Sequence, residues 1–424
     1  MTDTIFALSS GRPPAAIALI RISGPRASAV TEELCGSLPE PRRASVRTLR
    51  DQDGGVLDEA MVLWLPGPNT STGEDIAEYH CHGGSAVISA VEDALEACDG
   101  VRHAEPGEFT RRAFVNGRID LAQAEGLGDL LAAETDLQRR VAQQSASGIL
   151  SQRFADWRSR LLMLSARVEA VLDFDDEDDV TSLSDTFFAE LSDLASEWDG
   201  VLAEPRAERL REGIRVVLAG PPNSGKSSLF NVLLDESVAI VSDQAGTTRD
   251  VIERPVALAG IPFVLIDTAG IRYDSIDNIE NIGIAKARKQ AEEADVVLWL
   301  GPEGEGPQGA WEIESFADAQ GVRKKNPRHL VSAVTKEGVQ ALIADLIAEG
   351  RRKSPSATAT TINRRQSDAL QDACVSLRFF KKNADPLAIA EALRLARKSL
   401  DKLTGHSSTE EVLDNIFGRF CIGK

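Results

Sequence analysis

Cysteines and long apolar runs are scarce in this sequence, and their scarcity excludes whole classes of protein. The 424 residues include five cysteines, which are scattered and form no CxxC pair, so neither a disulfide framework nor a zinc site fits. No stretch reaches the ~18 consecutive apolar residues that span a bilayer. The opening residues MTDTIFALSSGRPP lack the basic and apolar regions of a signal peptide. We therefore expect a cytoplasmic protein that makes no membrane contact.

Positive charge is also in short supply. Lys and Arg number 47 against 66 Asp and Glu, which leaves a net charge of −19. This acidity argues against nonspecific phosphate binding as the main task, so any nucleic acid needs a local basic patch or a partner that supplies the charge. With 42% hydrophobic and 27% charged residues the composition is globular, and the length predicts two to four domains at ~150 residues each.

Hydrophobic patterning changes along the chain and predicts a multidomain protein with α/β and all-α parts. Strands are expected at 17–22 and 60–66 and a helix at 86–98, which indicates a mixed α/β domain at the N-terminus. Helical spacing then dominates on both sides of a second α/β segment. The expected boundaries are 1–119 for the N-terminal domain, 120–211 and 354–424 for two parts of one helical domain, and 212–353 for an inserted α/β domain.

The inserted segment has the pattern of a parallel sheet. Short apolar runs at 214–220, 263–270 and 295–301 end in glycine and alternate with helix-like stretches. A further strand is expected at 331–334 and a closing helix at 341–353. In the helical part, the acidic run DFDDEDD at 173–179 is interpreted as a solvated loop or face. A metal site is disfavoured there because the run has no histidine nearby.

A complete phosphate-binding loop follows the first strand of the inserted domain. Residues 220–227, GPPNSGKS, match GxxxxGK[ST] between a strand and a helix, a context that disfavours a chance glycine-rich turn. The glycines let backbone N–H groups approach the phosphates, Lys226 places its charge on the β- and γ-phosphates, and Ser227 can bind Mg²⁺. The other nucleotide contacts expected in this loop are Asn223, Ser224, Gly225 and Ser228.

Two later segments predict the switches of a GTPase. In AGTTRD (245–250), Thr248 is expected to sense Mg²⁺ and the γ-phosphate. In DTAG (267–270), Asp267 is expected to hold the Mg²⁺ shell and the Gly270 amide to contact the γ-phosphate. The remaining GTP contacts expected here are Thr247, Thr268 and Ala269. Together with the phosphate loop, these segments favour a GTPase over an ATPase.

Two elements of a common GTPase site are missing. Ile271 stands where a Ras-like protein has its water-orienting glutamine, and an apolar side chain cannot orient water. Asn223 is a candidate for binding a monovalent cation beside the phosphates, although an asparagine in a loop commonly satisfies its own backbone.

The guanine-reading motif NKxD is absent as well. Its nearest counterpart is Ser315-Phe-Ala-Asp318, in which Asp318 would pair with the guanine N1 and N2 donors. Ser332 and Ala333 match the element that contacts the guanine O6, and Phe316 can stack on the base. We expect a weakened but retained preference for guanine. The alternative is that 302–329 is shortened and Asp318 is fortuitous.

Four further motifs resemble the family of tRNA-modification GTPases MnmE, also called TrmE. They are LIRISG (19–24), TGEDIAEYHCHGG (72–84), PGEFTRRAFVNGRIDLAQAE (106–125) and the final FCIGK (420–424). With the phosphate loop and the switches, the resemblance covers nearly the whole chain. It implies a folate-binding α/β domain at the N-terminus, a discontinuous helical domain and an inserted Ras-like P-loop G domain.

The resemblance implies an activity, cofactors and partners. The family hydrolyses GTP and works in a heterotetramer with an FAD-containing flavoprotein of the MnmG (GidA) type. The pair adds an aminomethyl or carboxymethylaminomethyl group at C5 of the tRNA wobble uridine, with a 5,10-methylene- or 5-formyl-tetrahydrofolate as one-carbon source. The tRNA is expected to bind mainly through the partner. The N-terminal domain is expected to form a homodimer, and K⁺ to promote contact between the two G domains in the triphosphate state.

The resemblance also carries site residues over to this chain. The expected K⁺ ligands are the Asn223 side chain and backbone carbonyls around Ser242, Gln244 and Thr247. Glu280 matches the hydrolytic glutamate that orients the attacking water, although its spacing alone favours an ordinary exposed helix carboxylate.

For folate, the matching residues are Arg21, Glu78, Arg118 and Lys424. A carboxylate such as Glu78 can read the pterin edge, and the cations suit the glutamate tail. Arg118 stands where the family usually has lysine, and Ser71 replaces an aromatic residue. Cys421 is expected either to act chemically in the cavity near the folate or to be a small buried apolar side chain.

Two other functions remain open. A regulatory or assembly GTPase that binds ribosomal RNA or a client protein explains the phosphate loop and DTAG, but not residues 106–125 or the terminal CIGK. A folate-binding structural protein with a decayed G domain fits the lost NKxD. The intact Lys226, Ser227, Thr248 and Asp267 argue against such decay.

Overall fold

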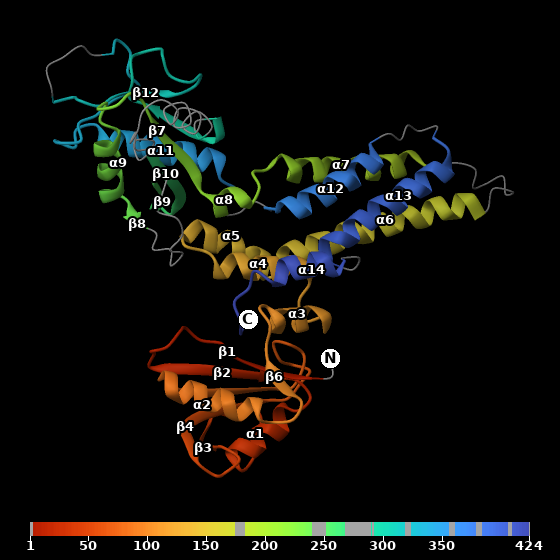
Figure 1. The fold of residues 1–424 in the computed structure, drawn as a ribbon. Helices are drawn as coiled ribbons and strands as arrows, with labels where there is room; N and C mark the ends of the chain where they lie inside the picture. The colour runs from red at the N-terminus through yellow and green to blue at the C-terminus, as the bar shows by residue number, and fades with distance from the viewer. Residues whose placement is uncertain are drawn as a thin grey trace, which may run out of the picture. The chain divides into compact units, whose positions relative to one another are not determined.

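The structure is a computed structural model, and Figure 1 shows its fold. The chain divides into two compact units. The structure describes residues 3–173, 183–239, 252–267, 290, 292–318, 324–355, 361–378, 384–405 and 409–423. The first unit comprises Met1–Gly128, Ala146–Ala155 and Asp401–Lys424, and the second comprises Asp129–Ser145 and Asp156–Leu400. No helix within these described stretches is both long and apolar enough to cross a membrane.

A six-stranded sheet forms the centre of the first unit. Its strands lie in the order β3-β4-β5-β2-β1-β6, and all neighbours are antiparallel except β1 and β6. The strands are β1 (Thr4–Leu8), β2 (Ile17–Ser23), β3 (Ser45–Arg50), β4 (Val56–Leu65), β5 (Ile76–His82) and β6 (Val101–His103). The strands predicted at 17–22 and 60–66 are confirmed as β2 and β4. The other four strands were not identified from the sequence.

Alternating residues along the strands of this sheet pack into separate clusters on its two faces. On one face, Ile20, Ile22 and Tyr79 are buried with apolar residues of α1 (Ala27–Cys35) and α2 (Ser85–Glu96). This confirms the helix predicted at 86–98. The neighbouring strand positions project to the opposite face. There the smaller cluster of Ile5, Ala7 and Ala104 is closed by Phe109 of α3 (Glu108–Val115).

The C-terminal helix completes the first unit. Leu121 and Ala124 of α4 (Leu121–Leu131) are buried together with Leu413 and Phe417 of α14 (Glu410–Phe417) and with Phe420. This cluster brings the two parts of the chain together although almost 300 positions separate them, because neither helix can bury its apolar stripe alone.

Helices dominate the second unit outside its sheet. Their bounds are α5 (Asp136–Ala146), α6 (Ile149–Asp173), α7 (Asp185–Ala203), α8 (Glu208–Glu212), α12 (Arg364–Leu377) and α13 (Pro386–Thr404). The first residues of α6, up to Ala155, and the last of α13, from Asp401, are counted with the first unit. On α6, Trp157, Leu161 and Leu164 are buried at three- and four-residue spacing. Trp157 packs edge-on against Trp198 of α7, with ring centroids 6.0 Å apart. Helices α7 and α12 contact each other, although the inserted domain separates them in the sequence. Beyond Asp173, the acidic run lies outside the described residues.

A seven-stranded sheet forms the inserted domain, in the order β13-β12-β11-β7-β10-β9-β8. Its strands are β7 (Ile214–Ala219), β8 (Val238–Ala239), β9 (Ile252–Leu258), β10 (Ile261–Asp267), β11 (Val296–Trp299), β12 (Trp311–Glu314) and β13 (His329–Leu330). Strands β10, β7, β11, β12 and β13 are parallel, and β9 is antiparallel to β10. Helix α9 (Lys226–Asp235) follows β7, and α11 (Val339–Lys353) is the predicted closing helix. The predicted fold class is confirmed, whereas the domain boundaries stay a prediction.

The strand expected at 331–334 was wrong by two residues. Strand β13 ends at Leu330, and Ser332 forms only an isolated bridge with Phe316. The Ser332 hydroxyl accepts hydrogen bonds from the Val334 and Thr335 amides, which turns the backbone away from the ladder. Strand β12 was missed, and no helix lies between β11 and β12, where 300–310 form turns.

Candidate functional site

The phosphate loop connects β7 to α9 through backbone conformations that glycine favours. Gly220 and Gly225 have φ values of +149° and +90°, and Asn223 also has a positive φ of +60°. A Cβ atom on Gly225 would lie 3.2 Å from the Ser315 hydroxyl, so the loop passes directly against the segment after β12. The hydroxyl of Ser224 is buried in this loop and has no partner among the described residues. Such an orphaned group suits a loop built around a polar ligand.

Lys226 points back into the loop that precedes it. Its ammonium group donates to the carbonyls of Gly220 and Pro221, at 2.9 and 2.7 Å. Burial lowers the pKa of Lys226, and the nearby Asp267 carboxylate offsets only part of this effect. A buried ammonium whose hydrogen-bond partners here are neutral carbonyls can be stabilised further by phosphate oxygens. The geometry therefore fits the predicted phosphate contact.

Ser227, in the first turn of α9, lies next to Asp267 at the carboxyl end of β10. The Ser227 hydroxyl donates to Asp267 Oδ2 at 2.8 Å. These oxygens suit Mg²⁺, which usually takes few protein ligands and completes its shell with water and substrate phosphates. Within the part of the chain that the structure describes, no cluster of three His, Cys, Asp or Glu residues forms a metal cage.

The candidate base-reading residues come together at the ends of β12 and β13. Ser332 donates to Asp318 Oδ1 at 2.6 Å, and this hydrogen bond is the main reason why the pKa of Asp318 lies below its ordinary value. The Ala317 amide donates to the Val331 carbonyl at 3.1 Å, so the two segments run side by side. Ala333 follows Ser332 directly. The arrangement presents an ionised carboxylate beside the serine–alanine pair.

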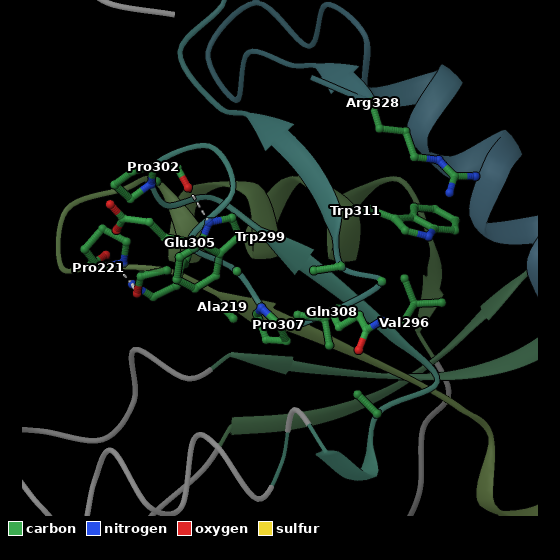
Figure 2. A pocket seen from close by; sticks show the side chains of 18 of the residues that line it. Ala219, Pro221, Val296, Trp299, Pro302, Glu305, Pro307, Gln308, Trp311 and Arg328 are labelled. Carbon is green, nitrogen blue, oxygen red and sulfur yellow. Dashed lines mark hydrogen bonds between the residues drawn. The ribbon is translucent and has the colours of Figure 1, made fainter. Parts of the chain in front are cut away.

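A cavity of about 1780 Å³ extends from the phosphate loop along the sheet (Figure 2). Near the loop, Trp299 donates its indole N–H to the Pro302 carbonyl at 2.8 Å. At the other end, the Arg328 guanidinium stacks on Trp311, 3.7 Å from the ring centroid. Turns rather than a helix connect β11 to β12, and residues of this connection line the cavity.

The motif residues of the N-terminal unit gather on the face of the sheet that carries α3. Arg21 of β2 and Glu78 of β5 are directly paired in the ladder, and the Arg21 Nε donates to Glu78 Oε1 at 2.9 Å. The Arg21 guanidinium also lies 5.9 Å from the Phe109 ring centroid. Arg118 is exposed, and the carbons of its side chain lie against Gly73 of the TGED segment.

The C-terminal segment reaches this unit too. Ser9 donates its hydroxyl to the Gly423 carbonyl at 2.9 Å, a contact between residues 414 positions apart. The Gly107 amide donates to the Cys421 carbonyl at 3.5 Å. Cys421 itself is exposed, which is at odds with the interpretation of it as a small buried side chain. Ser9 follows β1, and its amide donates to the carbonyl of Leu19, two residues along β2 from Arg21.

Comparisons with known proteins match both parts of this chain. A sequence profile described as the MnmE helical domain matches residues 121–421, and one described as the GTP-binding protein TrmE N-terminus matches residues 4–118. The tRNA modification GTPase MnmE of Erythrobacter litoralis (strain HTCC2594) is 56% identical over 423 residues, covering 100% of both chains. The chain belongs to the MnmE family of tRNA modification GTPases.

A second relative has a similar match. The tRNA modification GTPase MnmE of Novosphingobium aromaticivorans is 54% identical over 437 residues, again covering 100% of both chains. Among solved structures, the G domain of the T. maritima FeoB iron transporter covers 32% of this chain at 23% identity, with a TM-score of 0.23. That likeness is too weak to carry an argument. The predicted family and enzyme class, a tRNA modification GTPase, are thus confirmed.

Several predicted site residues lie outside the described residues. They are Ser242, Gln244, Thr247, Thr248, Thr268, Ala269, Gly270, Glu280 and Lys424. Their roles therefore stay predictions. The described residues of the nucleotide site are brought together at one edge of the second sheet, and Arg21, Glu78, Arg118 and Cys421 all lie in the first unit.

Arg112 is the residue that the sequence did not reveal. This guanidinium on α3 is fully buried and donates to the carboxylates of Asp3, Glu74 and Glu108, at 3.1, 3.1 and 2.9 Å. Glu74 belongs to the TGED segment, and Ser23 binds the same carboxylate oxygen at 2.8 Å. Arg112 therefore holds the TGED segment against α3. Two adjacent arginines in FTRRAF were the only sequence signal, and nothing in the sequence says which of them is buried.

Replacing Arg112 by methionine is expected to destabilise the first unit by about 3–5 kcal/mol, because three carboxylates lose their shared cation. The matched control is Arg111→Met on the same helix. Arg111 is partly exposed and pairs with Asp414 at 3.0 Å and with Glu410, so its loss should cost less than about 1 kcal/mol. Urea-dependent hydrogen exchange of peptides from β1 and α3 measures both changes. Equal effects of the two substitutions would contradict the assignment.

Acid is expected to weaken the same network. Burial raises the pKa of Glu108, but hydrogen bonds from Arg102, the Glu105 backbone and Arg112 outweigh it, so the pKa lies below its usual value. A carboxyl whose pKa is lower in the folded state stabilises the fold above its unfolded pKa, and this contribution is lost as the pH falls through the folded pKa. The free energy of unfolding of the first unit should therefore decrease as the pH falls below about 4, the ordinary range of carboxyl pKa values. In Glu108→Gln the drop should be smaller, and an unchanged pH profile would refute this account.

Proposed function

We propose that this chain hydrolyses GTP and that hydrolysis supports modification of the tRNA wobble uridine at C5. The observation that carries the proposal is the convergence of Lys226, Ser227 and Asp267 at the carboxyl ends of β7 and β10. In open α/β sheets, ligands bind at this edge, where the chain order reverses. The same edge carries Asp318 and Ser332, which follow β12 and β13 and are joined by a hydrogen bond of 2.6 Å.

In this proposal the phosphate loop holds the triphosphate. Backbone N–H groups of Asn223 through Ser228 surround the phosphates, together with Thr247 and residues 268–270. Ser227, Thr248 and Asp267 would hold Mg²⁺, which neutralises charge on the β- and γ-phosphates when it is bound. Lys226 binds the same oxygens from within the loop. Asp318, Ser332 and Ala333 select guanine.

Water activation falls to residues other than a glutamine. Glu280 orients the attacking water, because Ile271 offers no polar group. Asn223 is exposed at the mouth of the loop with a positive φ. With backbone carbonyls near Ser242, Gln244 and Thr247, it would hold K⁺, a charge beside the phosphates that acts where an arginine finger acts in other GTPases.

The one-carbon part of the proposal concerns the first unit. Arg21, Glu78, Arg118 and Lys424 would bind a tetrahydrofolate derivative, 5,10-methylene or 5-formyl, with Cys421 close by. The residues fit such a ligand, because the buried Nε2 of His80 has no hydrogen-bond partner among the described residues and lies 3.9 Å from Glu78 Oε2, beyond hydrogen-bond range. Buried polar groups of this kind are normally satisfied by a ligand or water. Arg21 binds Oε1, so Oε2 is the oxygen that faces His80.

Partners follow from the same proposal. An MnmG-type flavoprotein supplies FAD chemistry, forms a heterotetramer with a homodimer of this chain, and carries most of the tRNA contact. The net charge of −19 agrees with this division, because a strongly acidic chain is poorly suited to bind tRNA alone. The five free cysteines fit a site of action in the cytoplasm.

The first experiment compares GTP and ATP hydrolysis by the purified protein in potassium and in sodium. We expect potassium-stimulated turnover of GTP well above that of ATP. Lys226→Ala should abolish turnover, because the γ-phosphate loses its cation, whereas Lys325→Ala on the surface of the same domain should not. Equal turnover of both nucleotides would mean that 315–318 does not select guanine. No turnover in either salt would sink the hydrolase proposal for the chain alone.

The second experiment measures binding of 5-formyl-tetrahydrofolate by calorimetry. Removing a charged hydrogen-bond partner typically costs 1.5–3 kcal/mol, so Glu78→Gln should weaken binding by about tenfold or more. Glu59→Gln, an exposed carboxylate on β4 of the same sheet, is the control. Failure of the unaltered protein to bind would remove the one-carbon chemistry and favour a regulatory GTPase.

A further inference from the structure

The connection between β11 and β12 encloses a single aromatic ring. Its residues 301–309 have the sequence GPEGEGPQG, and the ring belongs to Trp299, the last residue of β11. We propose that Trp299 is a positioning residue for the phosphate loop, because the enclosed indole fixes the Gly220–Pro221 backbone to which Lys226 is bonded. This inference rests on the proposed nucleotide site and adds a residue that determines how that site holds phosphates.

Two glycines lie directly against the indole of Trp299. A Cβ atom on Gly306 would lie 2.7 Å from the Cγ of the ring, and a Cβ atom on Gly301 would overlap its six-membered part. Real atoms do not come this close, so the ring leaves no room for a side chain at either position. The indole N–H donates to the Pro302 carbonyl at 2.8 Å. The connection is thus wrapped around the ring and fixes its orientation.

The enclosed ring adjoins the start of the phosphate loop. Trp299 pairs with Ala219 in the ladder between β11 and β7. The same Cβ atom on Gly301 would lie only 2.9 Å from the Cδ of Pro221, so Gly301 lies between the indole and this proline. Figure 2 shows Trp299 and Pro221 at the same end of the cavity. A Cβ atom on Gly220 would lie 3.0 Å from the Gly301 nitrogen, so the two backbones touch.

Lys226 depends on this stretch of backbone. Its ammonium group donates to the carbonyls of Gly220 and Pro221, so the positions of these two oxygens set the direction of its charge. Closely packed groups transmit a displacement instead of absorbing it. A misplacement of about 1 Å in a catalytic site can cost about a hundredfold in rate. Trp299 therefore acts on the phosphates through Pro221 and Lys226, without touching them.

The connection is fastened on its other side as well. The Gly304 amide donates to Glu312 Oε1 at 3.1 Å, which ties the turn to β12. The Lys324 ammonium donates to the backbone carbonyl of Trp299 at 2.8 Å and to Glu312 Oε2 at 2.6 Å. The backbone on both sides of the ring is therefore held in place. A change in the ring must then move either this fastened connection or the phosphate loop beside it.

The test compares GTP hydrolysis in potassium by the full chain and by variants of the ring and of one glycine. Trp299→Leu removes the ring and its hydrogen bond, and it should lower kcat/KM by about 10- to 100-fold, the upper figure corresponding to a displacement of about 1 Å. Trp299→Phe keeps an aromatic ring without the N–H donor, so its effect should be smaller. Gly306→Ala keeps the tryptophan but presses a methyl group against it, and it should resemble Trp299→Leu.

The matched control is Trp311→Phe. Trp311 is buried in the same sheet but lies at the other end of the cavity, against Arg328. Its replacement should lower the thermal unfolding midpoint and leave kcat/KM unchanged. Tryptophan fluorescence gives a readout that a purely structural role would not move. Addition of GDP with Mg²⁺ should change the emission of the wild type and of Trp311→Phe, and most of this change should be lost in Trp299→Phe.

The positioning role and the nucleotide site fail in different ways. Wild-type kcat/KM in both Trp299→Leu and Gly306→Ala would overturn the positioning role and leave the GTPase intact. The same would follow if Trp311→Phe lowered kcat/KM as much as Trp299→Leu, or if the fluorescence change survived in Trp299→Phe. Calorimetry with GDP and Mg²⁺ tests the site itself, and a wild-type protein that binds no GDP would overturn the proposed function.

Discussion

The carboxyl ends of parallel strands meet at one edge of a sheet, and the nucleotide site depends on this constraint. Strand β7 leads into the phosphate loop, β10 ends at Asp267, and β12 ends next to Ser315. Two hydrogen bonds join these ends side by side: Ser227 to Asp267, and Ser315 to the Ser224 carbonyl. Segments that are distant in the sequence thereby form one surface, which agrees with a single nucleotide spanning from Lys226 to Asp318.

The absence of a helix between β11 and β12 shapes the rest of the site. Turns at 300–310 replace it, and Lys324 closes the gap by donating to the Trp299 carbonyl at 2.8 Å and to Glu312 at 2.6 Å. Glu314 accepts the Lys324 amide at 2.9 Å. These contacts hold the connections on either side of β12, so the short strand still presents the 315–318 segment to the phosphate loop. The segment that we propose to bind the base is thus supported by an ion pair and turns.

In the first unit the corresponding constraint is a buried charge. Arg112 is fully buried, so its guanidinium must be paired. Its carboxylate partners are Asp3 just before β1, Glu74 of the TGED segment and Glu108 of its own helix. The network fixes the segment whose Gly73 lies against Arg118. The contact of Ser9 with Gly423 brings the C-terminal segment to the same unit. Arg21, Glu78 and Cys421 lie in one unit because such long-range contacts bring the C-terminal segment to the first sheet.

Local sequence was sufficient for the phosphate loop, for strands β7 and β10, and for the helical character of the chain on either side of the inserted segment. Glycine positions and hydrophobic period act over only a few residues. The family resemblance rested on motifs of the same kind. Tertiary structure alone decided that Arg112 rather than Arg111 is buried, that Ser332 leaves the ladder, and that Ser315 reaches Ser224. The burial of Arg112 and the contact of Ser315 depend on partners about a hundred positions away, whereas Ser332 turns out of the ladder through the amides of Val334 and Thr335. A single sequence does not say which polar groups will meet once the core has closed.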